Sequence, residues 1–410
     1  MPSLFQINIT ANWGSHGRIA EQIGNLVLEE GWESYIAYGR WANPSRSRLI
    51  RIGSMNDERL HAVGTRLFDN HGLASRGATK ELVKRIESVD PDIIHLHNIH
   101  GYYLNYPILF RFLKSFGRPV VWTFHDCWPI TGHCSHFMFS GCDKWKKGCY
   151  GCGEKGEYPK SVFLDRSSRN YRLKKELFTS LGNLTLVPVS RWLESVLKES
   201  FMASVPTRCI HNGIDTEQFR IIGQAKERIG MSDKKVVLAV ASKWTPRKGF
   251  DDVVRLRELL DERFSIVVVG LADNQKRMLP SGIVGITRTN SVDELALYYS
   301  AADVFINPTY EDSLPTTNME ALACGTPVVT YETGGSPEVV DESTGIVVPR
   351  GDLSALVNAI RTVSSEWNRM ERKDLCRNRA VHFFKQEDRY REYYQLYQSL
   401  LKKMFHHGLE

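Results

Sequence analysis

Residues 307–349 constrain the fold more than any other stretch, because turn residues and apolar runs alternate there at short intervals. Pro315 suits the first turn of a helix, where its missing N–H is not needed, and Gly325 suits the end of that helix. The apolar run that begins at Val328 is typical of a buried strand. The stretch therefore predicts a loop, a short helix over 316–324 and a strand, which is the order found in a βαβ unit.

Short apolar runs recur along the chain and alternate with segments whose apolar residues have helical spacing, a pattern that predicts parallel sheets. We expect strands at 4–9, 91–96, 119–124, 184–189, 236–241, 266–270, 304–307 and 327–330. The chain has 410 residues, which suits two or three domains. We expect two α/β domains, over 1–205 and 206–385, with the Asn212-Gly213 turn near their junction.

Apolar residues make up 42% of the chain and charged residues 24%, which is typical of a globular protein. No apolar run approaches the ~20 residues that a membrane-spanning helix needs. The first residues are typical of a strand, not of a signal sequence, and we expect a cytoplasmic protein. We interpret the final Leu409-Glu410 as a cloning remnant.

The net charge of +6 is mild, but basic residues gather in two clusters. The clusters are Lys144, Lys146 and Lys147, and Arg166, Arg169, Arg172, Lys174 and Lys175. Such clusters either form solvated helix faces or contact anionic lipid or a diphosphate. They leave open a peripheral position on the cytoplasmic face of the inner membrane. The sequence carries no nucleic-acid-binding motif, so we expect no nucleic-acid partner.

Two acids, Glu311 and Asp312, lie in the loop before the predicted helix, and Glu320 lies inside the helix. A helix N-terminus at the carboxyl ends of parallel strands is an anion site. Carboxylates on either side of such a site can accept hydrogen bonds from hydroxyl groups. Hydroxyls, an anion and further hydroxyls are the parts of a nucleoside diphosphate sugar, so the segment predicts a nucleotide-sugar site.

The segment resembles family 4 of the retaining glycosyltransferases, which carries E-x7-E before A-x-A-C-G-T-P-V-V and then G-G-x-x-E. Glu320 matches the second acid and Glu338 the later one. The position eight residues before Glu320 is Asp312, with Glu311 beside it, so either residue can be the first acid. The resemblance implies that the first acid holds the sugar of the donor and Glu320 its ribose.

The resemblance implies the GT-B architecture, in which two Rossmann-like domains face a central cleft and a C-terminal helix, here over 386–405, crosses back to the first domain. It implies a hexosyltransferase that moves a sugar from a nucleoside diphosphate sugar to an acceptor hydroxyl. The anomeric configuration would be retained, and no catalytic metal is expected. Similar proteins build capsular or exopolysaccharide repeats, so a lipid-linked saccharide is the expected acceptor.

Cations follow the expected strand at 236–241. The family usually has an arginine and a lysine about five residues apart here; Lys248 matches the lysine, and Lys243 stands near the arginine position. With Arg247 they are expected to stabilise the departing diphosphate. The other expected donor-binding residues are Ser313, Leu314 and Thr316. The family places the base near residues 283–290, which we expect to form a loop.

Two features of the first half resemble the acceptor side of the family. Gly14 and Gly17 lie in a loop after the first strand, where glycines let backbone N–H groups approach a phosphate or hydroxyl, although a tight turn without a ligand is the alternative. His125 and Asp126 follow the strand at 119–124, where the family places a histidine near the transferred sugar. We expect His125 to be catalytic and Asp126 to orient it or contact the acceptor; a structural cap is the alternative.

Cys134, Cys142, Cys149 and Cys152 lie close together in the sequence. The last two have the C-x2-C spacing that lets two thiolates bind one tetrahedral ion. A cytosolic setting disfavours disulfides. Three interpretations remain open, namely a structural zinc site, independent reduced cysteines and a redox-active pair.

Two other functions fit the same fold. A nucleotide-sugar epimerase or hydrolase would keep the donor site and need no acceptor, so it would release sugar when no acceptor is present. A non-catalytic nucleotide-sugar-binding protein would account for the departures from the family pattern at Asp312 and Lys243. Such a protein would bind the donor tightly without turnover.

Overall fold

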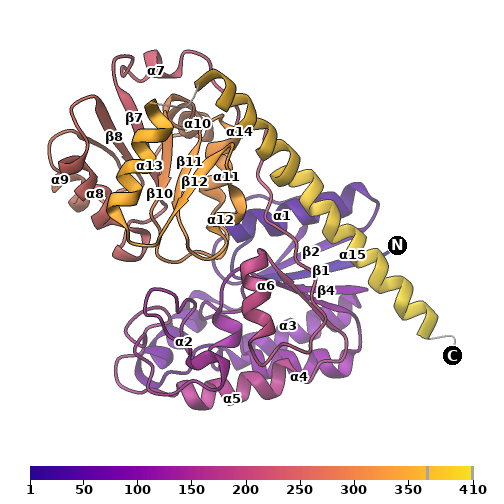
Figure 1. Ribbon diagram of the computed structural model, residues 1–410. Helices are drawn as coiled ribbons and strands as arrows, with labels where there is room; N and C mark the ends of the chain where they lie inside the picture. Colours follow the sequence, from indigo (N-terminus) through magenta and orange to yellow (C-terminus); the bar gives the residue numbers. More distant parts are fainter. Residues whose placement is uncertain (366–368, 408–410) are drawn as a thin grey trace. The chain divides into compact units, whose positions relative to one another are not determined.

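The computed structural model describes residues 1–365 and 369–407, and the interpreted cloning remnant Leu409-Glu410 lies outside this part (Figure 1). The chain forms two compact units. The first contains Met1–His211 and the chain from Arg389 onward, and the second contains Asn212–Asp388. The chain thus enters the second unit at the Asn212-Gly213 turn, whereas the sequence places the boundary at 205.

A parallel sheet of six strands, in the order β3-β2-β1-β4-β5-β6, forms the centre of the first unit. The strands are β1 (Ser3–Asn8), β2 (Glu33–Tyr38), β3 (Arg48–Arg51), β4 (Ile93–Leu96), β5 (Val120–Phe124) and β6 (Leu184–Pro188). The helices are α1 (Gly14–Glu29), α2 (Met55–Phe68), α3 (Arg76–Val89), α4 (Tyr106–Phe116), α5 (Ser167–Phe178) and α6 (Arg191–Lys198). The strand order reverses between β1 and β4, so the segments that follow these two strands meet at one edge of the sheet.

Burial explains why these segments take their structures. Every residue of β1 is buried, as a central strand of a parallel sheet requires. Helix α1 buries Ile19, Ile23 and Val27 along one face. The Ser190 hydroxyl accepts a hydrogen bond from the Leu193 N–H and thereby caps α6.

The second unit repeats this plan with a parallel sheet of six strands in the order β12-β11-β10-β7-β8-β9. The strands are β7 (Lys235–Val240), β8 (Phe264–Val269), β9 (Ile283–Ile286), β10 (Val304–Asn307), β11 (Val328–Tyr331) and β12 (Gly345–Val348). The helices are α7 (Ala225–Arg228), α8 (Phe250–Leu259), α9 (Asp273–Arg277), α10 (Val292–Ala301), α11 (Thr316–Ala323), α12 (Ser336–Val339), α13 (Leu353–Ser365) and α14 (Arg369–Phe384). Here the order reverses between β7 and β10.

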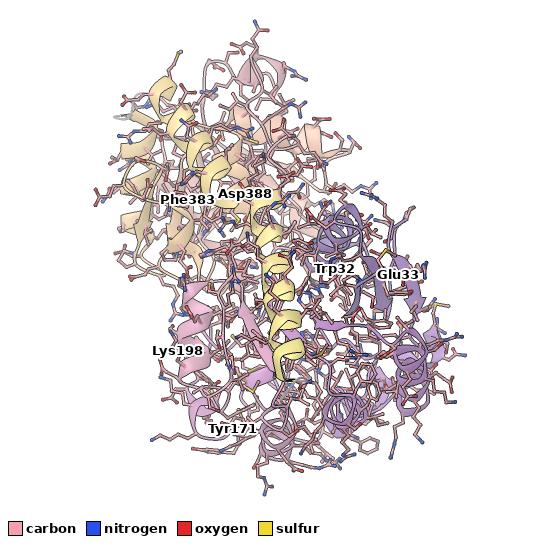
Figure 2. The ribbon with its side chains drawn as sticks, turned by 90° about the vertical axis from the view of Figure 1, so that its right-hand side faces the viewer. Trp32, Glu33, Tyr171, Lys198, Phe383 and Asp388 are labelled. Carbon is pink, nitrogen blue, oxygen red and sulfur yellow. The ribbon has the colours of Figure 1, made fainter. Side chains whose placement is uncertain are left out.

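Helix α15 (Gln386–His407) returns the chain to the first unit. It buries an aromatic and aliphatic stripe against the core of that unit, comprising Tyr390, Tyr393, Leu396, Tyr397 and Leu401. The Tyr397 hydroxyl lies 2.7 Å from His95 Nδ1, at the end of β4. Trp32, labelled in Figure 2, packs its ring edge-on against Tyr394 at 5.5 Å. The predicted C-terminal helix is therefore confirmed.

Three local predictions were wrong. Residues 283–290 were predicted to be a loop, but Ile283–Ile286 pairs with β8 and forms the edge strand β9. Gly14 and Gly17 lie in the first turn of α1 and not in a loop before it. Lys174, assigned to a basic surface cluster, is only 1% exposed, and its ammonium donates to the Trp128 carbonyl oxygen over 2.7 Å.

None of the described helices combines the length and apolar character needed to cross a membrane.

Candidate active site

Two loops pack together where the strand order of the second sheet reverses. The loop after β7 contains the short 3-10 helix η3 (Pro246–Lys248), and the loop after β10 leads to α11. Gly249 has a left-handed backbone with φ of +73°, and a Cβ on it would lie 2.1 Å from the Pro308 carbonyl oxygen. The Tyr310 N–H donates to the Arg247 carbonyl oxygen over 2.8 Å. Glycine at position 249 therefore lets the two loops meet backbone to backbone.

This packing brings two cations of one loop to two acids of the other. Arg247 Nη1 lies 2.8 Å from Glu311 Oε1, and Lys248 Nζ lies 2.7 Å from Asp312 Oδ2. The Glu311 side chain is 7% exposed and the Arg247 side chain 20%, so solvent screens this pair weakly. Lys243 is exposed and forms no ion pair with any residue in ranges 1–365 and 369–407. The structure thus brings Arg247 and Lys248 to the acids but leaves Lys243 apart from them.

Asp312 also fixes the start of α11. Its Oδ1 accepts a hydrogen bond from the Leu314 N–H over 3.2 Å, and its backbone carbonyl accepts one from the Gly335 N–H over 3.4 Å. Pro315 then directly precedes Thr316, the first helical residue. Asp312 therefore ties the acidic loop both to α11 and to the turn that precedes α12.

Glu320 lies one turn into α11 and is half-buried. The Tyr299 hydroxyl, which comes from α10, donates to Glu320 Oε2 over 3.0 Å. Burial, and after it the charge of Glu320, raise the pKa of Tyr299 well above its usual value, so the phenol stays protonated and keeps donating. Sequence reasoning missed Tyr299, because an aromatic residue within an ordinary helix carries no motif.

Four buried polar atoms near these loops have no hydrogen-bond partner among the described residues. They are Ser313 Oγ, Asn318 Nδ2, Thr333 Oγ1 and Ser336 Oγ. Buried polar groups are normally paired, and leaving one unpaired costs about 1–3 kcal/mol. Such polar atoms, in the segments after β10 and β11, can donate hydrogen bonds to the oxygens of a ligand. The sequence predicts only Ser313 among them, since the other three match no motif used above.

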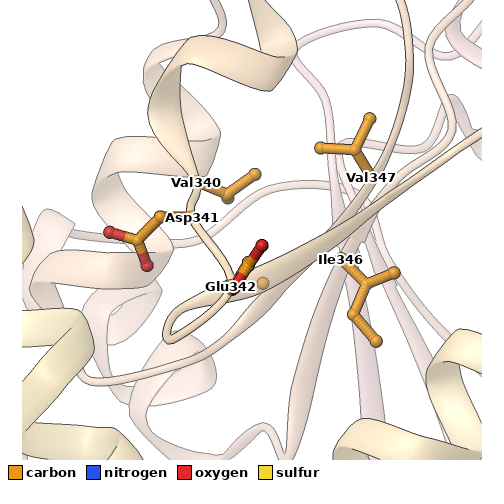
Figure 3. A pocket seen from close by; sticks show the side chains of 6 residues that line it. Val340, Asp341, Glu342, Ile346 and Val347 are labelled. Carbon is orange, nitrogen blue, oxygen red and sulfur yellow. The ribbon is translucent and has the colours of Figure 1, made fainter.

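A cavity of about 410 Å³ lies elsewhere in the second unit, beside the end of α12 and β12 (Figure 3). It is lined by Val340, Asp341, Glu342, Gly345, Ile346 and Val347. The Asp341 carboxylate accepts hydrogen bonds from the Ser343 and Thr344 hydroxyls over 2.7 and 2.9 Å. Glu338, the later family acid, is half-buried on α12 and does not belong to this lining. The cavity is thus separate from the paired cations and acids.

The first unit brings three histidines together where its strand order reverses. His16 follows β1, His97 follows β4 and His125 follows β5. His97 Nδ1 and His125 Nε2 lie 3.2 Å apart, and the ring centroids of His16 and His125 lie 5.9 Å apart. Burial is the main cause that lowers the pKa of His16 to about 4 and the pKa of His125 well below its usual value. Both imidazoles are therefore neutral near pH 7.

The two glycines of α1 have different surroundings. A Cβ on Gly17 would lie 2.5 Å from the Thr10 Oγ1 atom, so this glycine allows close packing against the preceding loop. Gly14 has φ of +68°, and a Cβ built there would have no neighbour within 4 Å among the described atoms. The backbone at Gly14 is thus open to a ligand, whereas Gly17 is needed for packing.

Asp126 directs its hydrogen bonds away from His125. Its Oδ2 lies 2.8 Å from His100 Nε2, and its Oδ1 accepts the Trp128 N–H over 2.9 Å. His100 Nδ1 in turn lies 2.9 Å from the Tyr158 hydroxyl. Burial alone would raise the pKa of Asp126, but the charge of His100 and its hydrogen bond outweigh burial, so the pKa lies below its usual range. Asp126 is thus an ionised partner of His100, a residue that sequence reasoning missed.

Comparison with known protein families identifies the chain. Residues 17–218 match the family model described as glycosyltransferase family 4, and residues 234–366 match the model described as glycosyl transferases group 1. The chain belongs to glycosyltransferase family 4. The family resemblance found in residues 307–349 is therefore confirmed.

Solved structures show the fold of this glycosyltransferase. Sucrose-phosphate synthase from Thermosynechococcus elongatus matches with a TM-score of 0.73 and 19% identity, over 98% of this chain and 100% of that one. HepE from Anabaena, in complex with UDP-glucose, matches with a TM-score of 0.66 and 12% identity, over 97% of this chain and 99% of that one. With its two parallel six-stranded sheets, the glycosyltransferase has the predicted GT-B fold.

A curated relative covers nearly the same length as this glycosyltransferase. WcaC of Escherichia coli K12, named as a colanic acid biosynthesis glycosyl transferase, is 23% identical over 376 residues. The match covers 87% of this chain and 89% of WcaC. The likeness therefore extends over both units of the glycosyltransferase.

The cysteines of the glycosyltransferase are all free thiols. Cys127, Cys324 and Cys376 are buried in the two cores. The four cysteines singled out in the sequence, Cys134, Cys142, Cys149 and Cys152, line one cavity of about 340 Å³. In ranges 1–365 and 369–407, no group of three or more histidine, cysteine, aspartate or glutamate side chains is placed to hold a metal ion as it stands.

Proposed function

We propose that this glycosyltransferase moves a sugar from a nucleoside diphosphate sugar to a hydroxyl of a saccharide acceptor, with retention of the anomeric configuration. The observation that carries this proposal is the pairing of Arg247 with Glu311 and of Lys248 with Asp312 beside the start of α11. Cations that can bind a diphosphate thus lie beside acids that can bind sugar hydroxyls. Both are at the carboxyl ends of β7 and β10, the two neighbouring strands between which the strand order of the sheet reverses. The complex of HepE with UDP-glucose supports a nucleotide sugar as donor.

The contacts divide the roles among these residues. We assign the diphosphate to Arg247 and Lys248, with the first turn of α11 beside them. Asp312 already uses one carboxylate oxygen for the Leu314 N–H and the other for Lys248, so we assign it a mainly structural role. Glu311 is then the acid that accepts hydrogen bonds from the sugar, and Glu320, held by the Tyr299 hydroxyl, accepts those of the ribose.

The proposed chemistry breaks the bond between the anomeric carbon and the diphosphate oxygen. Negative charge grows on the departing diphosphate, and the cations stabilise it more in the transition state than in the ground state. The acceptor oxygen bonds to the same carbon from the face that the diphosphate leaves, and its proton passes to a phosphate oxygen. We assign acceptor binding to the first unit, with the open backbone at Gly14 and the neutral His125.

The acceptor we propose is a lipid-linked saccharide used in the synthesis of a surface polysaccharide. The name of WcaC, which refers to colanic acid biosynthesis, supports a polysaccharide product. Lys146 and Lys147 are exposed in the first unit and can attract anionic lipid, which supports a peripheral position at the membrane surface.

A thermal-shift screen tests the donor. Nucleoside diphosphate sugars with uracil, guanine and adenine bases are each compared with the free sugar and with the matching nucleoside monophosphate. A ligand that binds only the folded protein raises the melting temperature, so at least one nucleotide sugar should do so while the free sugars do not. A screen in which no nucleotide sugar shifts the melting temperature would contradict the proposed donor.

The anomeric configuration of the product tests the mechanism. The donor found in the screen is incubated with saccharide acceptors, and the new linkage is assigned by NMR. Retention requires that an α-linked donor yields an α-linked product. Inversion would sink the retaining mechanism, and release of free sugar that is faster without acceptor than with it would favour a hydrolase.

A further inference from the structure

The connection between β5 and α5 is unusually long for a segment with almost no regular structure. It spans residues 125–166 and contains only two described 3-10 turns, η1 (Trp128–Ile130) and η2 (Lys144–Lys146). It nevertheless buries large side chains, among them Trp128 at 1% and Trp145 at 4% exposure. Loop-rich segments that hold such a structure usually rely on disulfides or a metal ion, and its cysteines are free thiols.

Four cysteines of this connection converge although they are spread over its sequence. Cys134, Cys142, Cys149 and Cys152 all line the cavity of about 340 Å³. The thiols of Cys134 and Cys152 are joined by a hydrogen bond. Two parts of the connection that are well separated in sequence thus meet through sulfur, a common ligand of structural zinc.

Two backbone N–H groups of the connection donate hydrogen bonds to these sulfurs. The Gly132 N–H donates to Cys149 Sγ over 3.2 Å, and the Glu154 N–H donates to Cys152 Sγ. Lys144 Nζ donates to the carbonyl oxygens of Tyr150 and Gly151, over 3.1 Å each, and so fixes the turn between the two cysteines. Hydrogen bonds from outside the ligand set orient the ligands of metal sites in the same way.

A histidine of the same cavity has a nitrogen left without a partner. His133 is 2% exposed, its Nδ1 lies 2.7 Å from Asp69 Oδ1, and its Nε2 has no hydrogen-bond partner among the described residues. His133 lines the same cavity as the four cysteines, and zinc-binding histidines likewise have one ring nitrogen held by a carboxylate while the other is left for the ion.

The buried Lys174 interacts electrostatically with the cysteines of this cavity. Lys174 is 1% exposed, and its ammonium donates to the Thr131 carbonyl oxygen over 3.0 Å. Burial lowers the pKa of Lys174 to about 7, and the negative charge of Cys149 and Cys134 as thiolates acts against this shift and favours the ammonium form. A zinc ion with four thiolates carries two net negative charges, and such a buried ammonium offsets part of that charge.

We propose that Cys134, Cys149 and Cys152 bind one Zn²⁺ and that Cys142 or His133 supplies the fourth ligand. Each thiol that binds releases its proton to solvent. Because no described group is placed to hold an ion as it stands, at least one side chain must turn inward. Cysteine can do so by rotation about a single bond, and Cys142, Cys149 and Cys152 are only half-buried.

The proposed ion is structural. A closed set of four ligands leaves no position for substrate, so the ion takes no part in sugar transfer. Its effect on the enzyme is to fix the connection that carries both Asp126 and Tyr158, the two residues that hold His100 from either side. Loss of the ion should therefore loosen this cluster and leave the second unit unchanged.

Metal content and spectroscopy of the full-length protein test the proposal. Protein produced with zinc in the medium should contain about one zinc per chain by elemental analysis. Exchange for Co²⁺ should give the intense visible absorption of a tetrahedral thiolate site together with sulfur-to-cobalt charge transfer. Protein without bound zinc, a cobalt spectrum without these bands, or a disulfide between Cys134 and Cys152 would each overturn the site.

Substitutions of single proposed ligands identify the residues that bind zinc, and a cysteine substitution outside the connection serves as a control for effects on folding. Cys152→Ser should lose zinc, whereas Cys209→Ser, a half-buried cysteine outside the connection, should keep it. His133→Asn retains a side-chain donor for Asp69 but removes the second ring nitrogen. Loss of zinc in only one of Cys142→Ser and His133→Asn assigns the fourth ligand, and retention of zinc in both variants contradicts the proposed set.

Discussion

Arg247 and Lys248, the residues to which we assign the diphosphate, each pair with a carboxylate. A diphosphate that binds them competes with Glu311 and Asp312 for the same N–H groups. We then expect Glu311 to be free to accept hydrogen bonds from sugar hydroxyls, so that binding of the two parts of a nucleotide sugar is coupled. The coupling depends on short charge contacts, and the Glu311 pair is the less exposed of the two.

The first prediction concerns Lys248. Lys248→Ala removes a positive charge from the departing diphosphate, and loss of one electrostatic donor should reduce turnover by about a hundredfold or more. Steady-state kinetics with the identified donor measure this effect. Lys243→Ala is the matched comparison, because Lys243 is exposed on the same loop, and it should lose much less activity. A Lys248 variant that keeps full turnover and loses only donor affinity would contradict the assigned role.

A second prediction separates the two adjacent acids. Glu311→Gln should weaken binding of the nucleotide sugar by roughly 1.5–3 kcal/mol, the range for losing hydrogen bonds to a charged group, but should not weaken binding of the nucleoside diphosphate, because Arg247 is then released from its pair with a carboxylate. Asp312→Asn keeps an oxygen for the Leu314 N–H and should affect the two ligands alike. Calorimetry with both ligands gives the comparison. Equal losses for both ligands in Glu311→Gln would mean that this acid does not contact the sugar.

The sequence predicts those site residues whose chemistry is local to a motif. Glu311, Asp312 and Glu320 follow from their spacing around Pro315 and the helix. Tyr299 and Ser336 do not, because each joins the site through the packing of a different βα segment. Neither the hydrogen bond from Tyr299 to Glu320 nor the burial of the Ser336 hydroxyl has a signature in the order of residues.

At the scale of elements, α15 is held by polar contacts as well as by apolar burial. The Tyr397 hydroxyl and His95 Nδ1 form a hydrogen bond of 2.7 Å, and the Thr123 hydroxyl donates a hydrogen bond to the Tyr393 hydroxyl over 3.1 Å. His95 Nε2 also lies 2.8 Å from the Thr123 Oγ1 atom. The helix thus completes a buried hydrogen-bond network on β4 and β5, the two strands that lead directly to His97 and His125.

A third prediction tests this network. Tyr397→Phe leaves the His95 ring nitrogen without a partner in the core, so the free energy of unfolding should fall by about 1–3 kcal/mol. Urea denaturation measures the change. Tyr394→Phe on the same helix is the control, since Tyr394 is half-buried and packs its ring on Trp32; its effect should be smaller. Equal effects of the two variants would show that Tyr397 contributes only ring packing.

Elements with strong apolar runs were predictable, and weakly patterned ones were not. The run at β10 was predicted with its observed bounds, Val304–Asn307. Four strands were not predicted, namely β2, β3, β9 and β12. Strand β3 is mostly exposed, and Gly285 interrupts the apolar run of β9. Pairing with a neighbouring strand decides their structure, and no local pattern records that neighbour.

At the scale of the whole molecule, buried histidines make stability depend on pH. Burial, followed by the positive charge of Arg40, lowers the pKa of His61 to about 4, and burial likewise lowers the pKa of His16 to about 4. The pKa values of His71 and His95 lie well below their usual value, with burial as the main cause. Below a pH of about 6.5 the unfolded chain binds protons that the folded chain does not, so stability falls as pH falls.

A fourth prediction follows from that sign. The free energy of unfolding should decrease steadily between a pH of about 6.5 and about 4, as urea denaturation at a series of pH values would show. His61→Gln should reduce the slope of unfolding free energy against pH, because it removes a side chain that binds a proton only in the unfolded chain within this pH window. His382→Gln, at an exposed position, should leave the slope unchanged. Stability that is flat or rising as pH falls through this window would refute the prediction.

The division of the chain into Met1–His211, Asn212–Asp388 and a returning helix has a consequence for biosynthesis. A ribosome that adds about 5–20 residues per second makes residues 212–388 in roughly 10–35 s. Throughout that interval the nascent first unit lacks α15, and the apolar surface that receives Tyr393 and Tyr397 stays uncovered. The second unit is continuous in sequence and can fold as it emerges. Completion of the first unit is therefore a late event in translation, and during the wait its unfinished surface is the natural target of chaperones.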